Sequence, residues 1–408
     1  MTSGFSGFSG FSGFSGFSGF SGWARVGLLL ACAGLAAGCG SGSPRASQNR
    51  GATASAPAVT VPLSTSLVTA QGTWAITVMG GSAASDNNFW QLFVRPAGAS
   101  QWSLVTPPGV ADNGGLVAAG TGKSLVIGFR PSQDLAFSPL ATSTDTGKNW
   151  TPGLLDADLA NDPGAIAVDP SGQALALLQD GIIQTAPTAA AAAAGRWSEL
   201  TTRQALAASA PGRNCGLREL DAVSFGVNRT PMAVGSCQRP GVAGVFIDAS
   251  GTWQSAGLVL PAEFRGDRAQ VLGLAATSGG NAALLLAGDS LLAAWSNGTR
   301  WTVSAPVAGV GSGSVRASGF GTGGSAWLLL SGGRAETISG PGTAWHSLPP
   351  VPPGTMTLAP AGTATLGLGG VWDALAVSGS ELTVWRLTKG AWAKVQLIKV
   401  PIEYGSSS

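Results

Sequence analysis

Charged side chains are scarce in this chain. Asp, Glu, Lys and Arg make up 10% of its 408 residues, and the formal net charge is +2, whereas about a quarter of the residues are charged in a typical globular protein. A balance this close to neutral gives no electrostatic basis for binding nucleic acid. The hydrophobic content of 44% argues against wholesale disorder. We therefore expect a folded chain of buried strands and tight turns, without a nucleic-acid partner.

Histidine and tyrosine are each present once, as His346 and Tyr404. A single histidine excludes metal sites built from several histidines, and a Ser-His-Asp arrangement would have to form around His346 on an expected outer strand. No glycine-rich segment has the P-loop pattern with its lysine. We expect no metal and no cofactor. Glycoside hydrolysis by two carboxylates stays open, because any two of the 20 acidic residues could converge.

The N-terminal part has the pattern of a leader. Residues 3–20 are six copies of Ser-Gly-Phe, a low-complexity tract that cannot build a core. The apolar run 26–37 is too short to span a bilayer and suits the hydrophobic region of a secretory signal. It is followed by Gly38-Cys39. This ending resembles a bacterial lipobox, in which the cysteine is lipidated and becomes the mature N-terminus.

The lipobox resemblance implies that residues 1–38 are cleaved and that Cys39 carries a lipid anchor. The protein would then be displayed at the outer face of the bacterial cytoplasmic membrane, and the anchor would be its sole contact with the membrane. Ordinary signal cleavage followed by secretion is the alternative. Residues 39–58 are rich in Ser, Gly and Ala, and this composition predicts a flexible linker between the anchor and the folded domain.

Two of the four cysteines lie beyond the leader, at Cys215 and Cys237. They flank two expected strands, 217–225 and 232–235, joined by a turn at 226–229. An antiparallel hairpin there brings the two cysteines nearly opposite one another, and an exported protein meets an oxidising environment. We predict a disulfide worth about 3 kcal/mol to stability, with a structural role and no redox chemistry.

Tryptophan recurs along the chain at a nearly constant interval. The series is separated by 48, 47, 56, 48, 44 and 47 residues, and its members are Trp102, Trp150, Trp197, Trp253, Trp301, Trp345 and Trp392. A recurrence with this period marks a repeat architecture. One repeat domain therefore accounts for most of the chain, because each unit needs to pack only on its neighbours.

Each repeat contains four short strands separated by Gly, Asn, Asp and Ser, and the tryptophan begins the last strand. The expected strands in three units are 115–120, 124–129, 135–142 and one from Trp150; 271–276, 282–287, 291–295 and 301–304; and 364–369, 373–377, 382–387 and 392–398. Four antiparallel strands repeated every ~45 residues, without helices, predict an all-β, seven-bladed β-propeller over residues 59–402. We expect a monomer with a disordered tail, 403–408. The ring could close by simple packing, by the final strand 394–402, or by the leading segment 59–65.

One turn carries a recognisable motif. Ser143, Asp145, Gly147 and Trp150 fit the pattern Ser/Thr-x-Asp-x-Gly-x-x-Trp. The Asp carboxylate can accept backbone N–H bonds within the turn, Gly supplies a positive φ, and Trp packs beneath it. With the repeats, the chain resembles the Asp-box (BNR-repeat) β-propellers, a group that includes sialidases, sortilin-type receptors and photosystem assembly factors. The resemblance covers residues ~60–402, and it implies that Asp145 is structural.

Degenerate copies of the motif lie at Trp253, Trp301 and Trp345. The sialidase members of the family imply a Tyr nucleophile with its assisting carboxylate, an Asp acid/base and three arginines that hold the substrate carboxylate. Here the single tyrosine, Tyr404, falls in the tail, and Arg130 before Pro131 fits a strand end better than an arginine motif. The pattern therefore favours a role without catalysis.

The scarce charges concentrate in neighbouring connections that lead into the first strands of repeats. These residues form a candidate binding face, although loops are also where charges are most easily solvated. They are Arg213, Arg218, Glu219, Asp221, Glu263, Arg265, Asp267 and Arg268, with Asp156, Asp158 and Asp162 in the preceding connection.

We interpret the protein as a non-catalytic module for binding or assembly that takes an unknown protein or carbohydrate ligand. An exo-sialidase-like secreted glycoside hydrolase is the first alternative. A sensor or scaffold domain of a membrane complex is the second.

Overall fold

The computed structural model describes residues 64–69, 71–80, 88–107, 116–121, 124–129, 140–152, 163–188, 191–192, 196–277, 279–298, 300–310, 314–361 and 370–401. The chain divides into two compact units, Met1–Thr53 and Ala54–Ser408, and all described residues belong to the second. The expected leader, Cys39, the linker and the tail with Tyr404 lie outside the described residues. No helix in the described part of the chain is long and apolar enough to cross a membrane.

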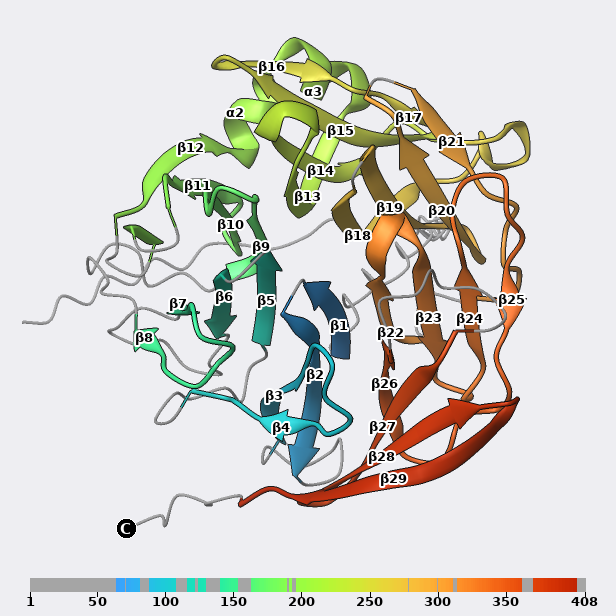
Figure 1. Ribbon diagram of the computed structural model, residues 1–408. Helices are drawn as coiled ribbons and strands as arrows, with labels where there is room; N and C mark the ends of the chain where they lie inside the picture. Colours follow the sequence, from blue (N-terminus) through green and yellow to red (C-terminus); the bar gives the residue numbers. More distant parts are fainter. Residues whose placement is uncertain are drawn as a thin grey trace, which may run out of the picture. The chain divides into compact units, whose positions relative to one another are not determined.

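The described strands form six sheets (Figure 1). The largest has eight strands: β1 (Ser64–Thr69), β2 (Gly72–Gly80), β3 (Asn88–Pro96), β4 (Ser103–Leu104), β22 (Val315–Phe320), β23 (Ala326–Leu330), β24 (Ala335–Ile338) and β25 (His346–Ser347). Two sheets of four strands contain β5 (Leu116–Thr121), β6 (Ser124–Phe129), β7 (Leu140–Ser143) and β8 (Thr151–Pro152), and then β9 (Pro163–Val168), β10 (Ala174–Leu178), β11 (Ile182–Ala186) and β12 (Ser198–Thr202).

The other three sheets follow along the chain. One has five strands: β13 (Leu217–Phe225), β14 (Pro231–Cys237), β15 (Val242–Ala249), β16 (Thr252–Ser255) and β17 (Leu258–Val259). The last two contain β18 (Ala269–Thr277), β19 (Gly280–Ala287), β20 (Ser290–Ser296) and β21 (Trp301–Val303), and then β26 (Thr355–Pro360), β27 (Trp372–Ser378), β28 (Glu381–Thr388) and β29 (Ala391–Lys399).

Strands pair antiparallel in chain order, so that each group of four is a meander in which the first strand lies at one edge and the fourth at the other. The eight-stranded sheet consists of two such meanders, β1–β4 and β22–β25. Parallel pairing of β1 with β22 joins them, in the register Ser64↔Ala317 to Ser66↔Gly319. The chain thus brings its first described strand against a strand some 250 residues later.

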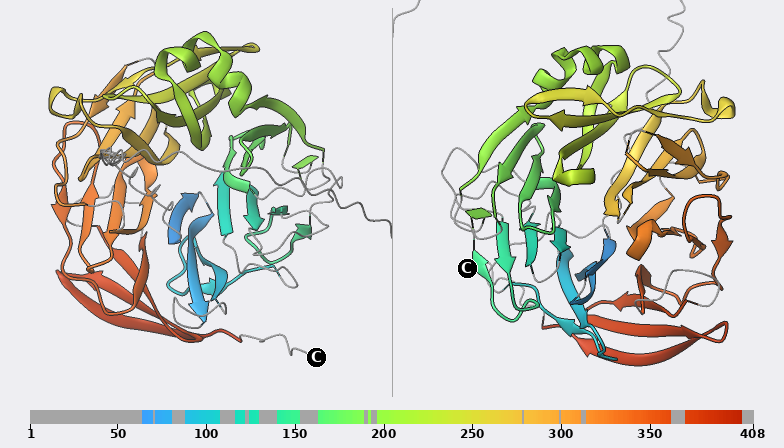
Figure 2. Two further views of the ribbon diagram at one scale, coloured as in Figure 1. Left: turned by 180° about the vertical axis from the view of Figure 1, so that it is seen from behind. Right: turned by 45° about the horizontal axis from the view of Figure 1, so that its top comes forward.

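Hydrophobic clusters form between consecutive sheets. Residues of β18–β21 pack on β13–β17 through one face and on β22–β25 through the other. The β26–β29 sheet packs in the same way on β22–β25 and on β1–β4, so that the last sheet contacts the first (Figure 2). The first strands of neighbouring sheets also contact one another. Sheets packed face to face in a closed succession, with their first strands innermost, are the arrangement of a β-propeller.

Strand composition follows this arrangement. Second strands have both faces covered, so they are mainly apolar: every residue of β10, β19 and β23 is buried. First strands are rich in Ala and Gly, as in β9 and β18, because small side chains let neighbouring inner strands approach. Fourth strands are the most exposed, and β29 has no buried residue.

One expectation about the strands is wrong. The first strand of the last sheet is β26, residues Thr355–Pro360, and not 364–369. Residues 362–369 lie outside the described part. The expectation followed the Ala- and Gly-rich composition of 364–369, which is typical of an inner strand. Of the three closures left open by the sequence, simple packing is the one found among the described strands: β29 pairs with β28, and the β1–β4 and β26–β29 sheets meet by side-chain packing.

Helices are present, contrary to the expectation of a chain without them. Helices α2 (Arg203–Ala208) and α3 (Ala210–Cys215) connect β12 to β13. The side chains of Thr202 and Ser209 cap them by accepting bonds from the N–H groups of Ala205 and Gly212. This connection explains why Trp197 and Trp253 are 56 residues apart, the longest interval of the series.

Candidate functional site

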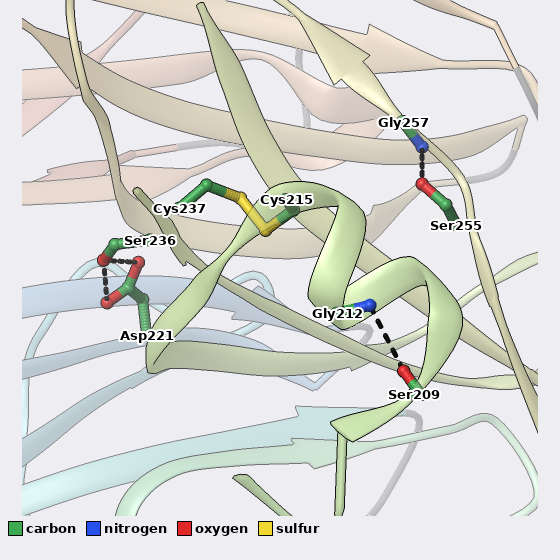
Figure 3. Close-up of a disulfide and its surroundings, with 8 residues drawn as sticks. All are labelled: Ser209, Gly212, Cys215, Asp221, Ser236, Cys237, Ser255 and Gly257. Atoms are coloured by element: carbon green, nitrogen blue, oxygen red, sulfur yellow. Dashed lines mark hydrogen bonds between the residues drawn. A yellow bond between two sulfur atoms is a disulfide. The ribbon is translucent and has the colours of Figure 1, made fainter. Parts of the chain in front are cut away.

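The predicted disulfide is confirmed. Cys215, the last residue of α3, is bonded to Cys237, the last residue of β14, with an S–S distance of 2.02 Å and a Cα–Cα distance of 5.2 Å (Figure 3). Cys237 pairs with Leu217 at the start of β13. Both sulfurs would lie 3.1 Å from a Cβ added at Gly244, which leaves room there for glycine alone. The bond therefore fastens the end of the helical connection to β14, the strand that pairs with β13.

Asp145 organises the turn between β7 and β8. Its Oδ1 accepts bonds from the N–H of Asn149 at 2.9 Å and from the hydroxyl of Ser143 at 3.0 Å. The N–H of Gly147, which has φ 77°, donates to the Ser143 hydroxyl. The bond from the Asn149 N–H is the main reason that the pKa of Asp145 is lowered. With its acceptors occupied inside the turn, Asp145 acts as a structural group.

The seven tryptophans all lie within one residue of the first residue of a fourth strand. Four of them donate their indole N–H to a backbone carbonyl just after the fourth strand of the preceding sheet, at 2.9 to 3.3 Å. These bonds are Trp150 to Val105, Trp301 to Ala256, Trp345 to Ala305 and Trp392 to Pro349. Trp102 donates instead to Asp373 of the last sheet, and Trp197 donates to Ala192. Trp253 packs in the core between β9–β12 and β13–β17. The four repeated indole hydrogen bonds thus connect consecutive sheets.

The expected charged binding face is dispersed over several elements. Arg213 lies on α3, whereas Arg218, Glu219 and Asp221 lie on β13. The remaining residues precede β18: Glu263 is on a 3-10 turn (Ala262–Phe264), and Arg265, Asp267 and Arg268 follow it. Most are exposed. Among the described residues no ion pair joins any two of them. Asp156, Asp158 and Asp162 lie outside the described residues.

Asp221 differs from the rest of that set. It is skipped by the pairing register of β13, between Leu220 and Ala222, so it occupies a bulge beside the inner strand of the next sheet. The Ser236 hydroxyl donates to the carboxylate of Asp221, with its oxygen 3.0 and 3.2 Å from the two carboxylate oxygens (Figure 3). The carboxylate also accepts a bond from the N–H of Val271 on β18 at 3.4 Å. Burial raises the pKa of Asp221 to about 7, and the nearby Glu219 adds to the rise.

A cluster that the sequence did not reveal lies where the first and last sheets meet. Asp373 on β27 is fully buried and receives three donors: the Trp102 indole at 2.9 Å, and Nε and Nη2 of Arg386 at 2.7 and 3.1 Å. Nε of Arg95, on β3, forms an ion pair with it at 3.3 Å. The Arg95 guanidinium also stacks 5.5 Å from the centre of the Trp102 ring.

Backbone atoms complete this cluster. Nη1 and Nη2 of Arg95 donate to the carbonyls of Ala361 and Pro360, each at 2.7 Å. Arg386 donates to the carbonyl of Ser100 at 3.2 Å. Burial lowers the pKa of Arg95 despite the attraction of Asp373, while the bond to Asp373 raises the pKa of Arg386. Two guanidinium groups thus share one carboxylate, and one positive charge remains uncompensated within the cluster.

A pocket of about 390 Å³ opens against the two arginines. The turn between β1 and β2, the turn between β3 and β4, and the end of β26 form its walls. The lining residues are Val68, Thr69, Gly72, Thr73, Arg95, Pro96, Ala97, Gly98, Ala99, Ser100, Ala361 and Arg386. The only ionisable side chains in this lining are the two arginines. Within the described part of the chain, no group of His, Cys, Asp and Glu has the arrangement of a metal site.

The signal for this cluster was present in the sequence. Arg95 and Asp373 lie among the buried apolar residues of β3 and β27, and Arg386 lies on the partly buried β28; an ionised group inside a buried strand needs a partner. Which residues would be partners could not be read from the sequence, because Arg95 and Asp373 are 278 positions apart.

No protein-family model and no curated protein sequence matches the chain. Among solved structures, the chain is similar to YCF48 bound to a D1 peptide, with 15% identity, a TM-score of 0.46, and coverage of 79% of this chain and 92% of that one. It is also similar to the periplasmic gluconolactonase PpgL of Pseudomonas aeruginosa, with 13% identity, a TM-score of 0.45, and coverage of 80% and 96%. Likenesses at this level assign no function to the chain.

Proposed function

We propose that this protein is a non-catalytic binding module: a monomeric, seven-bladed β-propeller that holds a protein or carbohydrate ligand. We further propose that the lipid-anchored Cys39 and the linker 39–58 display it at the outer face of the bacterial cytoplasmic membrane. The lipobox-like sequence supports the anchor, and the four-stranded meanders packed in succession support the seven blades.

The pocket at Arg95 and Arg386 carries the proposal. Two guanidinium groups against one carboxylate leave a net positive charge at a concave site, and arginine forms paired hydrogen bonds with planar oxyanions. Arg386 retains 20% of its side-chain surface, so its guanidinium can reach a bound group. The ligand would therefore present a carboxylate to this pocket.

The same lining disfavours catalysis. Glycoside hydrolysis needs a proton donor and a nucleophile or base beside the scissile bond. The pocket lining supplies hydroxyls from Thr69, Thr73 and Ser100, and no carboxyl or imidazole. Asp373 lies behind the arginines, buried and engaged by three donors. Binding is thus the chemistry that these residues support.

A binding screen tests the proposal. The purified protein would be titrated against peptides with free carboxyl termini and glycans bearing carboxylates, and hydrolysis of fluorogenic sialosides would be measured in parallel. We expect saturable binding of at least one carboxylate ligand and no sialoside turnover. Turnover that disappears on mutating residues of this pocket would contradict the proposal and favour the glycoside hydrolase.

Two variants separate binding from folding. Arg386→Gln removes the reachable charge, and we expect it to weaken binding about tenfold or more. Gly98→Asn adds a side chain to the pocket lining without touching the Asp373 cluster, because nothing lies within 4 Å of a Cβ at Gly98 and Asn tolerates its φ of 77°. Arg265→Gln, at an exposed arginine outside the pocket lining, is the matched control and should bind as the wild type does.

A further inference from the structure

The fourth strand of the last sheet, β29, is unlike the other fourth strands. It has nine residues, whereas β4, β8, β12, β16, β21 and β25 have two to five. It pairs with β28 from Ala391 to Lys399, with one bulge at Val395, which the register skips, and no other described strand pairs with its second edge. Figure 1 shows β28 and β29 as the long red hairpin at the outside of its sheet. A long edge strand is a ready template for another extended chain.

The hydrogen-bond pattern between β28 and β29 determines which backbone groups of β29 point toward its open edge. The N–H of Val400 bonds to the carbonyl of Ser380, so Val400 points its backbone groups toward β28. Inward and outward positions alternate along an antiparallel ladder, and the ladder is regular from Gln396 to Lys399, beyond the bulge at Val395. Leu397 and Lys399 therefore direct their N–H and C=O groups away from β28, where a partner strand can pair with them.

The side chains of this edge combine apolar surface with positive charge. Gln396 bonds to the backbone of Trp102 and Ile398 packs toward the β1–β4 sheet. Leu397 and Lys399 consequently lie on the opposite face. Leu397 is 43% exposed and Val395 38%, which are two of the four exposed large hydrophobic residues in the described part of the chain.

Lysine is concentrated in this hairpin. Three of the five lysines of the chain, Lys389, Lys394 and Lys399, lie within eleven residues. Nζ of Lys399 lies 3.6 Å from Oε1 of Glu381, and 78% of the Lys399 side chain is exposed. An exposed ion pair of this kind contributes little free energy, so Lys399 can pair with a carboxylate of a bound segment instead. Pairing of two copies of β29 would bring lysines together, so these charges oppose self-association and favour an acidic partner.

We propose that β29 is a docking edge for an extended, acidic segment of a partner protein, which adds to the sheet as a further strand. The segment would place an apolar residue opposite Leu397 and acidic residues opposite Lys394 and Lys399. Backbone hydrogen bonds would supply most of the affinity, and the lysines would favour a segment with acidic side chains. This edge is separate from the arginine pocket, since none of its residues lines that pocket.

Amide hydrogen exchange on the full chain tests the proposal. The probe is the blocked peptide Thr-Glu-Thr-Val-Thr-Glu-Thr, and the control peptide has Lys in place of both Glu residues. Without peptide, we expect the amides of Leu397 and Lys399 to exchange fast and those of Ile398 and Val400 to be protected. The acidic peptide should slow exchange at Leu397 and Lys399 about tenfold or more, and the basic peptide should not.

Two variants complete the test. Lys394→Glu should weaken binding of the acidic peptide about tenfold and strengthen binding of the basic peptide. Leu397→Pro removes an outward N–H that the ladder does not use, and it should abolish binding while Ile398 stays protected.

The proposal is overturned if both peptides bind equally, or if the acidic peptide leaves exchange at Leu397 unchanged. Protection that rises with protein concentration alone would assign the edge to a second copy, and binding to anionic vesicles without protection at Leu397 would assign it to a lipid surface. Either result would also overturn it.

Discussion

The titration of Asp221 gives the most quantitative prediction. Burial between β13 and β18 raises its pKa from an ordinary value of 3.8 to about 7. An acid with a raised folded-state pKa binds more protons in the folded than in the unfolded state between these two values. Its contribution to stability is therefore complete below about pH 4 and is lost as the pH rises to about 7.

The size of the loss follows from the shift. Three pKa units correspond to about 4 kcal/mol. Asp221 retains some solvent contact, which screens the penalty, and we take about half of that figure, ~2 kcal/mol. Asp221→Asn removes the charge, while the amide oxygen can still accept from Val271 N–H and the amide nitrogen can donate to Ser236. Relative to wild type, the variant should thus gain ~2 kcal/mol of unfolding free energy between pH 4 and 7.

Urea unfolding followed by tryptophan fluorescence measures this directly, at pH 4, 5, 6, 7 and 8. The difference between Asp221→Asn and wild type should grow up to pH 7 and stay constant above it. Glu263→Gln, at an exposed carboxylate that does not act on Asp221, is the control and should leave the pH profile unchanged. Parallel profiles for wild type and Asp221→Asn would refute the reasoning, because Asp221 would then titrate alike in the folded and unfolded chains.

Three further predictions concern stability. Replacing both Cys215 and Cys237 by Ser should cost about 3 kcal/mol in urea unfolding, from the 22-residue separation that the bond closes; an unchanged midpoint would show that the bond is not formed. Trp150→Phe should lower the free energy of unfolding by about 1 kcal/mol, since the Val105 carbonyl loses its donor. An unchanged free energy of unfolding would show that this indole bond does not stabilise the contact between sheets. Asp373→Asn should lower stability by about 3 to 5 kcal/mol, because the buried guanidinium of Arg95 and the partly buried one of Arg386 lose their counter-charge. Calorimetry at several salt concentrations checks this last change, and a melting temperature equal to wild type would contradict it.

Local patterns in the sequence predicted local structure well. The four strands around Trp301 match β18 to β21 within a few residues, and the expected disulfide is present. Both depend on contacts between nearby residues, which turn signals and alternation encode directly. Helices α2 and α3 were missed because they occupy only six residues each, too few for a helical period to stand out.

The candidate site was beyond the reach of such patterns. Arg95 and Asp373 meet only because the first and last sheets pack together, and no spacing rule encodes that contact. The charges that the sequence did single out, such as Arg213 and Arg265, are exposed loop and helix residues without a shared ion pair. Clustering along the chain identified solvated connections, whereas Arg95 and Arg386 are single arginines on strands, far from any cluster of charges in the sequence.

The central claim is that the pocket at Arg386 binds a carboxylate ligand and leaves it chemically unchanged. Calorimetric titration of the wild type and of Gly98→Asn with the best ligand from the screen, followed by mass spectrometry of the ligand after prolonged incubation, tests it most directly. We predict saturable binding to the wild type, at least tenfold weaker binding to Gly98→Asn, and complete recovery of the intact ligand. Equal affinity for both proteins, or a converted ligand, would contradict the account.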